Sequence, residues 1–383
     1  MGRKGAVVAG HICLDIIPRI PGGNVQARLT PGTLIEIGPA LLSTGGLVSN
    51  TGCSLHTLGI DTRLMGKVGD DPFGRIILDL IRAQDAALTQ NMIVVPGEVS
   101  SYTIVLSPPD ADRSFLHCPG ANHTFGADDL DCATLRDARL FHFGYPPVME
   151  RMYLDDGAEL ETMFRCAREA GVITSLDMVM PDPQGPSGRV DWRSILQRTL
   201  PHVDIFLPSL DELLVLLRRE MPVSPQAADA LLSEMAAQML EWGAGIVVLK
   251  LGARGLYLRI GERGIAALPD AGWRERELWA PCFVPEPLVG TTGAGDATIA
   301  GFLAGVLRGQ SVEAALTSAV AVGACNVEAA DALSGVRSWD ATQARVAAGW
   351  ARQAVTVGVP GWAWDAGHAL WIGPHDAFLR KRV

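Results

Sequence analysis

The sequence lacks the cysteine pattern of a secreted or zinc-binding protein. Its seven cysteines are scattered through 383 residues, and no two of them form a CxxC pair. We therefore expect neither a disulfide framework nor a zinc site, and buried thiols in a reducing compartment fit better. The N-terminus begins like a secretory signal, but His11 and Asp15 interrupt the apolar stretch that follows. Cytoplasmic localisation is the expectation.

Two further absences exclude two kinds of partner. No run of 18 apolar residues is present, so the sequence predicts no membrane span. No Lys/Arg-rich stripe is present either, and the net charge is -10. Nucleic-acid binding depends on neutralising phosphates with basic side chains, so nucleic acid is not an expected partner.

Strand-like and helix-like segments alternate through most of the chain. Helical segments are predicted at 157–170 and 225–242. The alternation is typical of an α/β protein with a mostly parallel sheet covered by helices on both faces. The predicted strands between the helices are 139–143, 172–176, 203–207 and 246–251.

Other segments have less regular patterns. We expect a first strand over 6–14 that ends at Asp15, a helix over 45–58 with Asn50 off its apolar arc, and a strand over 62–68. The sequence also predicts a hairpin over 94–116 with its turn at 108–110, an irregular segment over 260–288, and one long helical tract over 296–330.

A Gly-rich turn carries the strongest chemical signal. Thr292-Gly293-Ala294-Gly295-Asp296 consists mainly of small residues and directly precedes a helical pattern. Amides at a helix start attract anions, and a carboxylate beside them can take a proton from a hydroxyl group. This combination suits phosphoryl transfer, although Asp296 alone could also be a helix N-cap. No Gly-Lys-Ser/Thr follows, and Thr298 occupies the third Gly position of a dinucleotide fingerprint, so neither nucleotide-binding motif is present.

The turn resembles the C-terminal signature of the PfkB carbohydrate kinases, the ribokinase-like family. Four more segments resemble that family in the same order along the chain. They are the stretch from Gly45-Gly46 through Asn50 to 66–74, Gly120-Ala121-Asn122, 208–212 and 250–255. The resemblance spans roughly residues 6–340. It implies a three-layer α/β sandwich with a mostly parallel sheet and a small β-sheet lid.

The resemblance implies a role for each matching position. Asp296 would be the general base, and the amides of Gly293, Ala294 and Gly295 would hold the phosphoryl charge. Mg²⁺ and ATP would be required, with Glu212 organising the metal. The positions that would bind the sugar are Asp15, Gly45, Gly46 and Asn50, and those that would bind the nucleotide are Lys250, Gly252, Gly255 and Thr292.

Structural alternatives stay open for these residues. Asp15 could simply end a strand, Gly45-Gly46 could be only a tight turn, and Asn50, Glu212 and Lys250 could be solvated surface groups. The chain also departs from the family at two positions. Gly290 stands where the family has Asp near a monovalent-cation site, so potassium activation is an open question. Ser209 replaces the Asn of the family's Asn-x-x-Glu motif.

The resemblance also implies a division of the chain. Residues 1–345 would be the kinase domain, with a lid from about 16–40 and 92–118 that excludes water, and 346–383 would be an extension without an assigned role. Such a lid makes a homodimer plausible.

Several side chains outside the main motifs are candidates too. Arg113, Phe115 and His117 would share one face of the predicted hairpin as possible substrate groups. His142 is expected to be a core histidine, and Asp177, at a strand end, could face the cleft.

The sequence thus predicts ATP-dependent phosphorylation of a sugar or sugar-acid hydroxyl. Two alternatives remain open. One is a nucleoside kinase of the same fold, and the other is a non-catalytic sugar- or nucleotide-binding regulator.

Overall fold

A ten-stranded sheet dominates the described part of the chain. The computed structural model describes residues 5–20, 30–107, 114–222, 224–265, 267–268 and 271–380. Six neighbouring strands, from β12 to β4, pair in parallel, and the strands beyond β12 are antiparallel. In order across the sheet, the strands are β15 (Ala363–Asp365), β16 (Leu370–Ile372), β14 (Glu277–Ala280), β13 (Leu256–Ile260), β12 (Ile246–Lys250), β11 (Ile205–Phe206), β10 (Ile173–Asp177), β9 (Leu140–Gly144), β1 (Ala6–Gly10) and β4 (Thr62–Met65).

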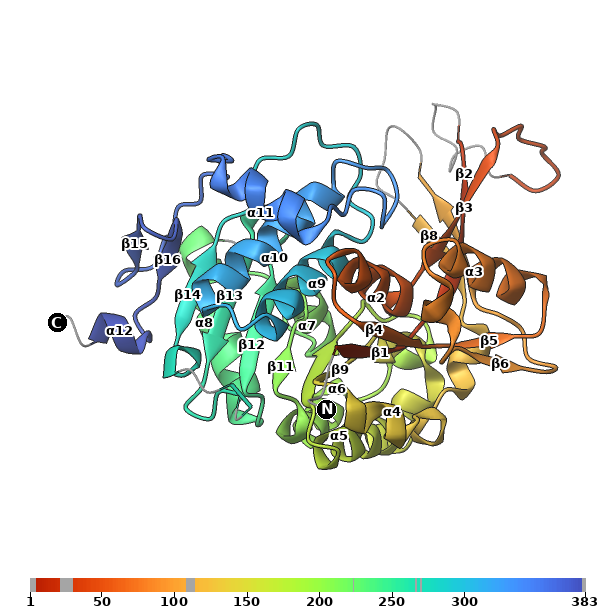
Figure 1. The fold of residues 1–383 in the computed structure, drawn as a ribbon, viewed down its shortest axis with the longest axis horizontal. Coiled ribbons are helices and arrows are strands. Elements are labelled where there is room, and N and C mark those ends of the chain that lie inside the picture. The colour runs from red at the N-terminus through yellow and green to blue at the C-terminus, as the bar shows by residue number, and fades with distance from the viewer. Residues whose placement is uncertain are drawn as a thin grey trace.

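Helices cover both faces of this sheet, as Figure 1 shows. Alternate residues of a strand point to opposite faces, so Val8 packs with the helices of one layer and Val7 with those of the other. The first layer contains α2 (Leu47–Thr57), α9 (Ala294–Leu307) and α10 (Val312–Asn326), and the second contains α5 (Ala158–Glu169), α6 (Trp192–Thr199), α7 (Leu210–Leu216) and α8 (Pro225–Glu241). The remaining helices are α3 (Pro72–Arg82), α4 (Cys132–Asp137), α11 (Trp339–Ala347) and α12 (Ala377–Arg380). The predicted three-layer α/β fold is confirmed.

A second, four-stranded sheet stands beside the first, at the upper right of Figure 1. Its order is β3 (Ala40–Gly45), β2 (Cys13–Pro18), β7 (Tyr102–Leu106) and β8 (Ser114–Cys118). The prediction of one strand over 6–14 was wrong, because the chain leaves the main sheet after Gly10 and β2 joins the second sheet. Asp15 therefore lies inside β2 and does not end a strand.

The connection after α2 differs from the sequence-based prediction. The expected strand over 62–68 divides at Gly66 into β4 and β5 (Lys67–Gly69), and β5 pairs with β6 (Ile93–Val95). The predicted hairpin over 94–116 is formed only by β7 and β8, because β6 belongs to this separate small sheet. Its predicted turn at 108–110 and Arg113 lie outside the described residues.

The predicted helical tract over 296–330 is two helices. Gly309 has a φ of 72°, a left-handed conformation that ends a helix, and the Ser311 side chain then caps α10 by accepting from the Ala314 N–H. The two helices pack against each other behind the Gly-rich turn. Within the segment predicted to be irregular, β14 forms a regular strand.

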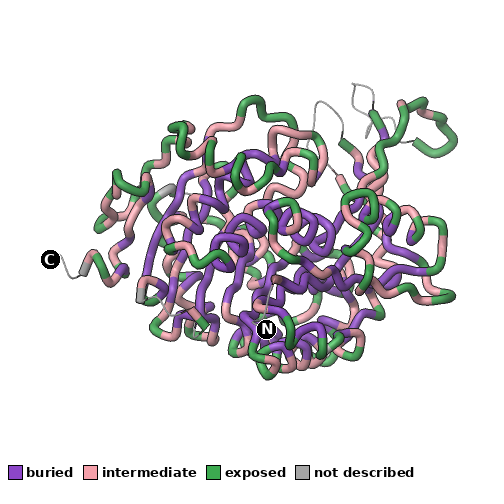
Figure 2. Tube along the Cα trace, viewed as in Figure 1, coloured by how far each residue is buried: buried purple, intermediate pink, exposed green. Residues whose placement is uncertain are grey.

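The C-terminal segment extends the main sheet at the edge farthest from the second sheet. β16 pairs with β14, and β15 pairs with β16 (Figure 1). Figure 2 shows buried residues concentrated along the main sheet and exposed residues at the outer end of the second sheet. The Gly-rich turn, at the start of α9, lies between the main sheet and the second sheet.

Candidate functional site

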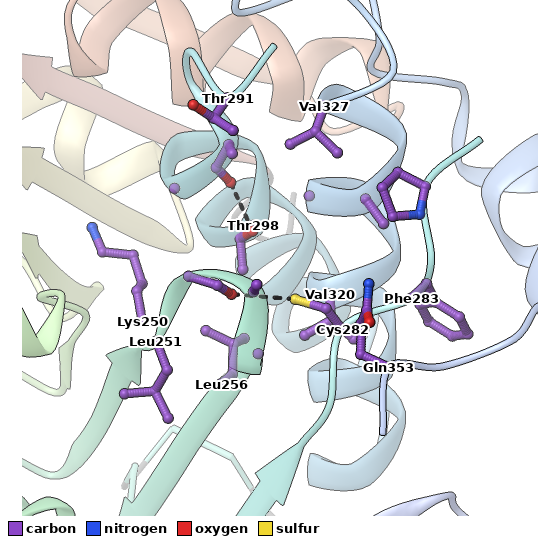
Figure 3. A pocket seen from close by; sticks show the side chains of 18 of the residues that line it. Lys250, Leu251, Leu256, Cys282, Phe283, Thr291, Thr298, Val320, Val327 and Gln353 are labelled. Atoms are coloured by element: carbon purple, nitrogen blue, oxygen red, sulfur yellow. Dashed lines mark hydrogen bonds between the residues drawn. The ribbon is translucent and has the colours of Figure 1, made fainter. Parts of the chain in front are cut away.

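Two cavities meet at the Gly-rich turn. One, of about 930 Å³, is lined by residues of the second sheet and by Gly293 and Asp296. The other, of about 370 Å³, is lined by Ala294, Gly295 and the end of β12, and Figure 3 shows it from close by. Thr291 lines both cavities. After the ligands that the sequence predicts there, we name the first the acceptor cavity and the second the nucleotide cavity.

Asp296 lies between them, with its side chain almost fully buried. It is only 4% exposed, and three other side chains donate hydrogen bonds to its carboxylate. Asn50 Nδ2 donates to Oδ2 at 3.0 Å, Thr51 Oγ1 donates to Oδ1 at 3.3 Å, and the Tyr145 hydroxyl contacts both oxygens at 2.8 and 2.9 Å. These donors fix the orientation of the carboxylate toward the acceptor cavity.

Burial raises the pKa of Asp296 above that of an ordinary carboxyl group. The Lys250 ammonium group and the hydrogen bonds from Asn50, Tyr145 and Thr51 oppose this increase in the pKa. A carboxylate with a raised pKa is a stronger base than one in water, while the opposing groups keep the ionised form accessible.

Sequence reasoning missed Tyr145 and Thr51. Tyr145 directly follows β9, and its φ of 70° is unusual for a non-glycine residue. The rule that ligands bind at the carboxyl ends of parallel strands could have indicated it. Thr51 was counted only as part of the apolar arc of a helix, and no sequence signal distinguishes it.

The backbone around Asp296 forms the start of α9. Gly293 is left-handed, with a φ of 70°, and a Cβ atom there would lie 2.5 Å from the Cβ of Ala332. The Ala294 N–H donates to the Thr291 carbonyl at 3.3 Å, so this amide already has a partner within the turn. The N–H groups of a helix's first turn have no acceptor within the helix, and here they lie where the two cavities meet.

The predicted sugar-binding residues gather in the acceptor cavity. Asp15, Gly46 and Asn50 line it. Gly45 does not, but a Cβ at this position would lie 2.4 Å from Asp15 Oδ2, so glycine leaves the space that this carboxylate occupies. Asn50 is only 6% exposed, because α2 is packed between the sheet and α9, which excludes the solvated alternative.

Asp15 is itself in an unusual environment. Burial raises its pKa to about 6, and Cys13 Sγ lies 3.3 Å from Oδ1. Its carboxylate can accept hydrogen bonds from hydroxyl groups in the cavity.

The second sheet contributes two of the three predicted hairpin residues. Phe115 and His117 both line the acceptor cavity, as their alternate positions predict. His117 Nδ1 lies 3.0 Å from Thr103 Oγ1, and its Nε2 lies 3.3 Å from Nε2 of His11. Burial lowers the pKa of His117 to about 4, so the pair is neutral at physiological pH.

The predicted nucleotide-binding residues divide between the cavities. Lys250, Gly252 and Gly255 line the nucleotide cavity. Thr292 lines the acceptor cavity instead.

Lys250 is held by two carboxylates. Its ammonium group lies 2.6 Å from Asp177 Oδ1 and 3.9 Å from Glu212 Oε2. Burial opposes its charge, but the two carboxylates raise the pKa of Lys250 above its ordinary value, so it remains a cation beside the Gly-rich turn. Asp177 was predicted to face the cleft. It is fully buried beneath Lys250 and lines neither cavity.

Glu212 and Ser209 form a reciprocal helix cap. The Ser209 N–H donates to Glu212 Oε2 at 2.7 Å, and Ser209 Oγ accepts from the Glu212 N–H at 3.1 Å. No group of three or more His, Cys, Asp or Glu in the described residues could hold a metal ion. Mg²⁺, however, commonly keeps several waters and binds one or two carboxylates together with substrate phosphates. Glu212 lines neither cavity, but it lies 3.9 Å from the ammonium group of Lys250, which lines the nucleotide cavity.

Two further predictions concern the body of the protein. His142 is fully buried and its Nδ1 lies 2.9 Å from Ser175 Oγ, so it is a core histidine as predicted. No helix in the described ranges has the length and apolar character needed to cross a membrane.

Comparison with known proteins identifies similar chains. The model of the pfkB family carbohydrate kinases matches residues 6–339. An uncharacterized sugar kinase from Archaeoglobus fulgidus is 30% identical over 68% of this chain and 88% of its own. Fructokinase-2 from Zea mays is 26% identical over 79% of this chain and 80% of its own.

Solved structures share the fold. Ribokinase from Arabidopsis thaliana, complexed with ribose and ATP, aligns with a TM-score of 0.70 at 22% identity and covers 90% of this chain and 98% of its own. A nucleoside kinase from Burkholderia thailandensis, in complex with inosine, aligns with a TM-score of 0.64 at 18% identity and covers 91% and 100%.

Proposed function

The chain belongs to the pfkB family of carbohydrate kinases, which are phosphotransferases, and from this premise we propose that it transfers the γ-phosphoryl group of ATP to a hydroxyl group of a sugar or sugar acid. The observation that carries the proposal is the buried Asp296 carboxylate at the junction of two cavities. A hydroxyl group in one cavity and a triphosphate in the other would meet beside this base.

In the proposed reaction, Asp296 takes the proton of the acceptor hydroxyl as its oxygen attacks the γ-phosphorus. The bond from that phosphorus to the bridging oxygen breaks, and ADP leaves with the electron pair. The first-turn amides of α9 and the Lys250 ammonium group stabilise the negative charge of the phosphoryl group. Of the predicted amides, those of Gly293 and Gly295 are the better candidates, because the Ala294 N–H already donates within the turn.

Asp15 and Asn50 orient the acceptor in this proposal. Asp15 accepts hydrogen bonds from its hydroxyl groups, and Asn50 positions the catalytic carboxylate at 3.0 Å. In this proposal the second sheet acts as a lid, and Phe115 and His117 on it keep water away from the transferring group. This lid differs from the one predicted over 16–40 and 92–118, because β6 belongs to another sheet and β3 reaches Gly45. Glu212 would hold hydrated Mg²⁺, which supplies charge neutralisation of the ATP phosphates when bound.

Replacement of Asp296 tests the base. Asp296→Asn should lower kcat by about 100-fold or more, because the amide cannot take the proton, while leaving ADP binding nearly unchanged. Asp61→Asn, which removes an exposed carboxylate before β4, is the control and should retain activity. Turnover by Asp296→Asn at the parent's rate would remove Asp296 from this role.

An acceptor screen coupled to ADP release tests the substrate class. Turnover with a sugar or sugar acid supports the proposal. Turnover with adenosine or inosine and with no sugar would favour the nucleoside kinase alternative, and membership of a phosphotransferase family argues against the non-catalytic regulator. Running the screen with and without potassium also addresses the effect of Gly290.

A further inference from the structure

A part of the chain outside the family match contributes one residue to the wall of the nucleotide cavity. The match ends at residue 339, yet Gln353 lines this cavity. The Gln353 N–H donates to the Cys282 carbonyl at 2.7 Å, and the Val284 N–H donates to the Ala351 carbonyl at 2.9 Å. These bonds, on either side of the bridge between Phe283 and Arg352, fix the register of the tail against the cavity wall.

Aromatic and charged contacts hold this segment in place. The Trp350 ring stacks on Phe283 with centroids 4.6 Å apart and planes inclined by 19°. Its indole N–H donates to the Val284 carbonyl at 2.7 Å. The Arg352 guanidinium lies 4.4 Å from the centroid of the Phe283 ring and donates to the Pro281 carbonyl at 2.8 Å.

The far end of the tail is anchored as well. Asp376 is fully buried and accepts from Arg276 Nε at 2.8 Å, while β16 extends the main sheet beside β14. The segment that carries Gln353 is thus held on both sides, and this fixes the position of Gln353 in the cavity wall.

The chemistry of the cavity changes along its length. Figure 3 labels residues at both ends of the cavity: Lys250 lies on one side, and Gln353, Cys282 and Phe283 lie on the other. Lys250 and the Gly-rich turn suit phosphates. The opposite side is largely apolar and includes Phe283, Val320 and Val327, which suits a flat heteroaromatic ring.

Gln353 adds a carboxamide to this apolar end. A carboxamide offers one hydrogen-bond donor and one acceptor, and the edge of adenine offers the complementary N6–H donor beside a ring-nitrogen acceptor. We propose that Gln353 hydrogen-bonds the edge of the nucleotide base, so that the C-terminal segment determines the preference for the base of the phosphoryl donor. This inference rests on the proposed function, in which the second cavity takes ATP.

Binding of ADP measured by calorimetry tests the contact without knowledge of the acceptor. Gln353→Ala should weaken ADP binding roughly three- to tenfold, the loss expected for one or two net hydrogen bonds. Inorganic pyrophosphate, which has no base, should bind Gln353→Ala as it binds the parent. Equal weakening of both ligands would indicate a structural effect and overturn the proposal, as would unchanged ADP binding.

A second variant tests which base is read. Gln353→Glu presents only acceptors, so it should lose affinity for ADP and lower the ratio of ADP to GDP affinity by about tenfold or more, since guanine has adjacent N–H donors. An unchanged ratio would contradict readout of the base. Thr356→Ala, an exposed change in the same segment, is the control and should bind both nucleotides like the parent.

Kinetics with an acceptor from the screen separate the two proposals. Gln353→Ala should raise KM for ATP while leaving kcat and the acceptor's KM unchanged, as expected for a contact made equally in the ground and transition states. A fall in kcat with an unchanged KM for ATP would overturn the role of Gln353. If ADP binding depends on Gln353 as predicted but the parent phosphorylates no sugar, the proposed function fails while the contact between Gln353 and the base stands.

Discussion

Asp15 shows how a single residue can favour function at a cost in stability. Its carboxyl group has a pKa of about 6, raised by burial, whereas an Asp in the unfolded chain titrates near 4. The native state therefore holds this proton more tightly than the unfolded state. The associated stability is fully present below about pH 4 and is lost as the pH rises through 6.

Asp15→Asn should therefore stabilise the protein at pH 7.5, by about 2 kcal/mol, and by much less at pH 4.5. It should also raise KM for the phosphoryl acceptor, because the substrate's hydroxyl groups lose a charged carboxylate to which they donate hydrogen bonds. Thermal unfolding at both pH values and steady-state kinetics check the two effects. A variant that is no more stable than the parent at pH 7.5, when compared with Asp61→Asn, would contradict the predicted cost of the buried charge.

Tyr145 is one of the two site residues that sequence reasoning missed. Its hydroxyl group contacts both oxygens of Asp296, and this interaction lowers the pKa of the carboxyl group against the effect of burial. Tyr145→Phe should raise that pKa and move the acidic limb of the kcat profile to higher pH, by about one pH unit.

The pH profile of kcat at saturating acceptor measures this shift. Tyr153→Phe removes a hydroxyl group from another residue of the acceptor cavity and is the matched control. If both variants show the same profile as the parent, Tyr145 does not tune the base.

At the scale of single residues, the sequence predicted the groups that lie in motifs. Asp15, Gly46, Asn50 and Asp296 line one cavity, while the roles that the resemblance implies for them stay predictions. Thr51 and Tyr145 were missed, because their proximity to Asp296 depends on packing between elements far apart in the chain, although the position of Tyr145 at the end of β9 could have indicated it. Their distance from Asp296 along the sequence leaves no local pattern.

At the scale of elements, hydrophobic periodicity located the central strands and the helices between them. β9, β10, β11 and β12 fall within the predicted segments or within one residue of them. Errors arose where the partner of a strand decided its path. β2 continues an apolar run but pairs with a different sheet, and β14 is a strand because β13 and β16 lie on either side of it. Periodicity along one segment carries no information about such partners.

The division between α9 and α10 was missed for a different reason. Both helices are apolar on nearly every side, since each is buried between the sheet, its neighbour and other helices. A continuous apolar pattern therefore masked the break at Gly309, although glycine followed by a Ser cap is a recognised helix boundary.

At the scale of the whole molecule, the C-terminal segment had no predicted role, and the division at 345 remains a prediction. Its contacts with the main body of the protein are with residues distant in sequence, such as Ile372 with Leu278 and Asp376 with Arg276. The composition of the segment, rich in Trp and Gly, does not indicate these partners. These pairings depend on the folded main sheet, and the sequence of the segment itself carries no pattern that predicts them.

The second sheet raises the question of assembly. Ile16 pairs with Leu42 on one side and Ile104 on the other, and Ile104 pairs with Leu116. Paired residues share a face, and Asp15, next to Ile16, points to the opposite face. A row of apolar side chains thus crosses the face turned away from Asp15, and its outer members Leu42 and Leu116 are 41% and 57% exposed.

Ile16 packs against the protein's own core, but Leu42 and Leu116 remain exposed. We expect these two to lie in a homodimer interface, because exposed apolar side chains gathered on a sheet commonly mark a contact with another chain. The parent should be a dimer by light scattering, and Leu42→Glu combined with Leu116→Glu should be a monomer, since a dimer would bury four carboxylates. The matched change Leu42→Gln with Leu116→Gln should weaken the dimer less. A monomeric parent at about 10 μM, well above the Kd of a stable dimer, would refute the assembly. A charged variant that remains a dimer would place the interface on another surface.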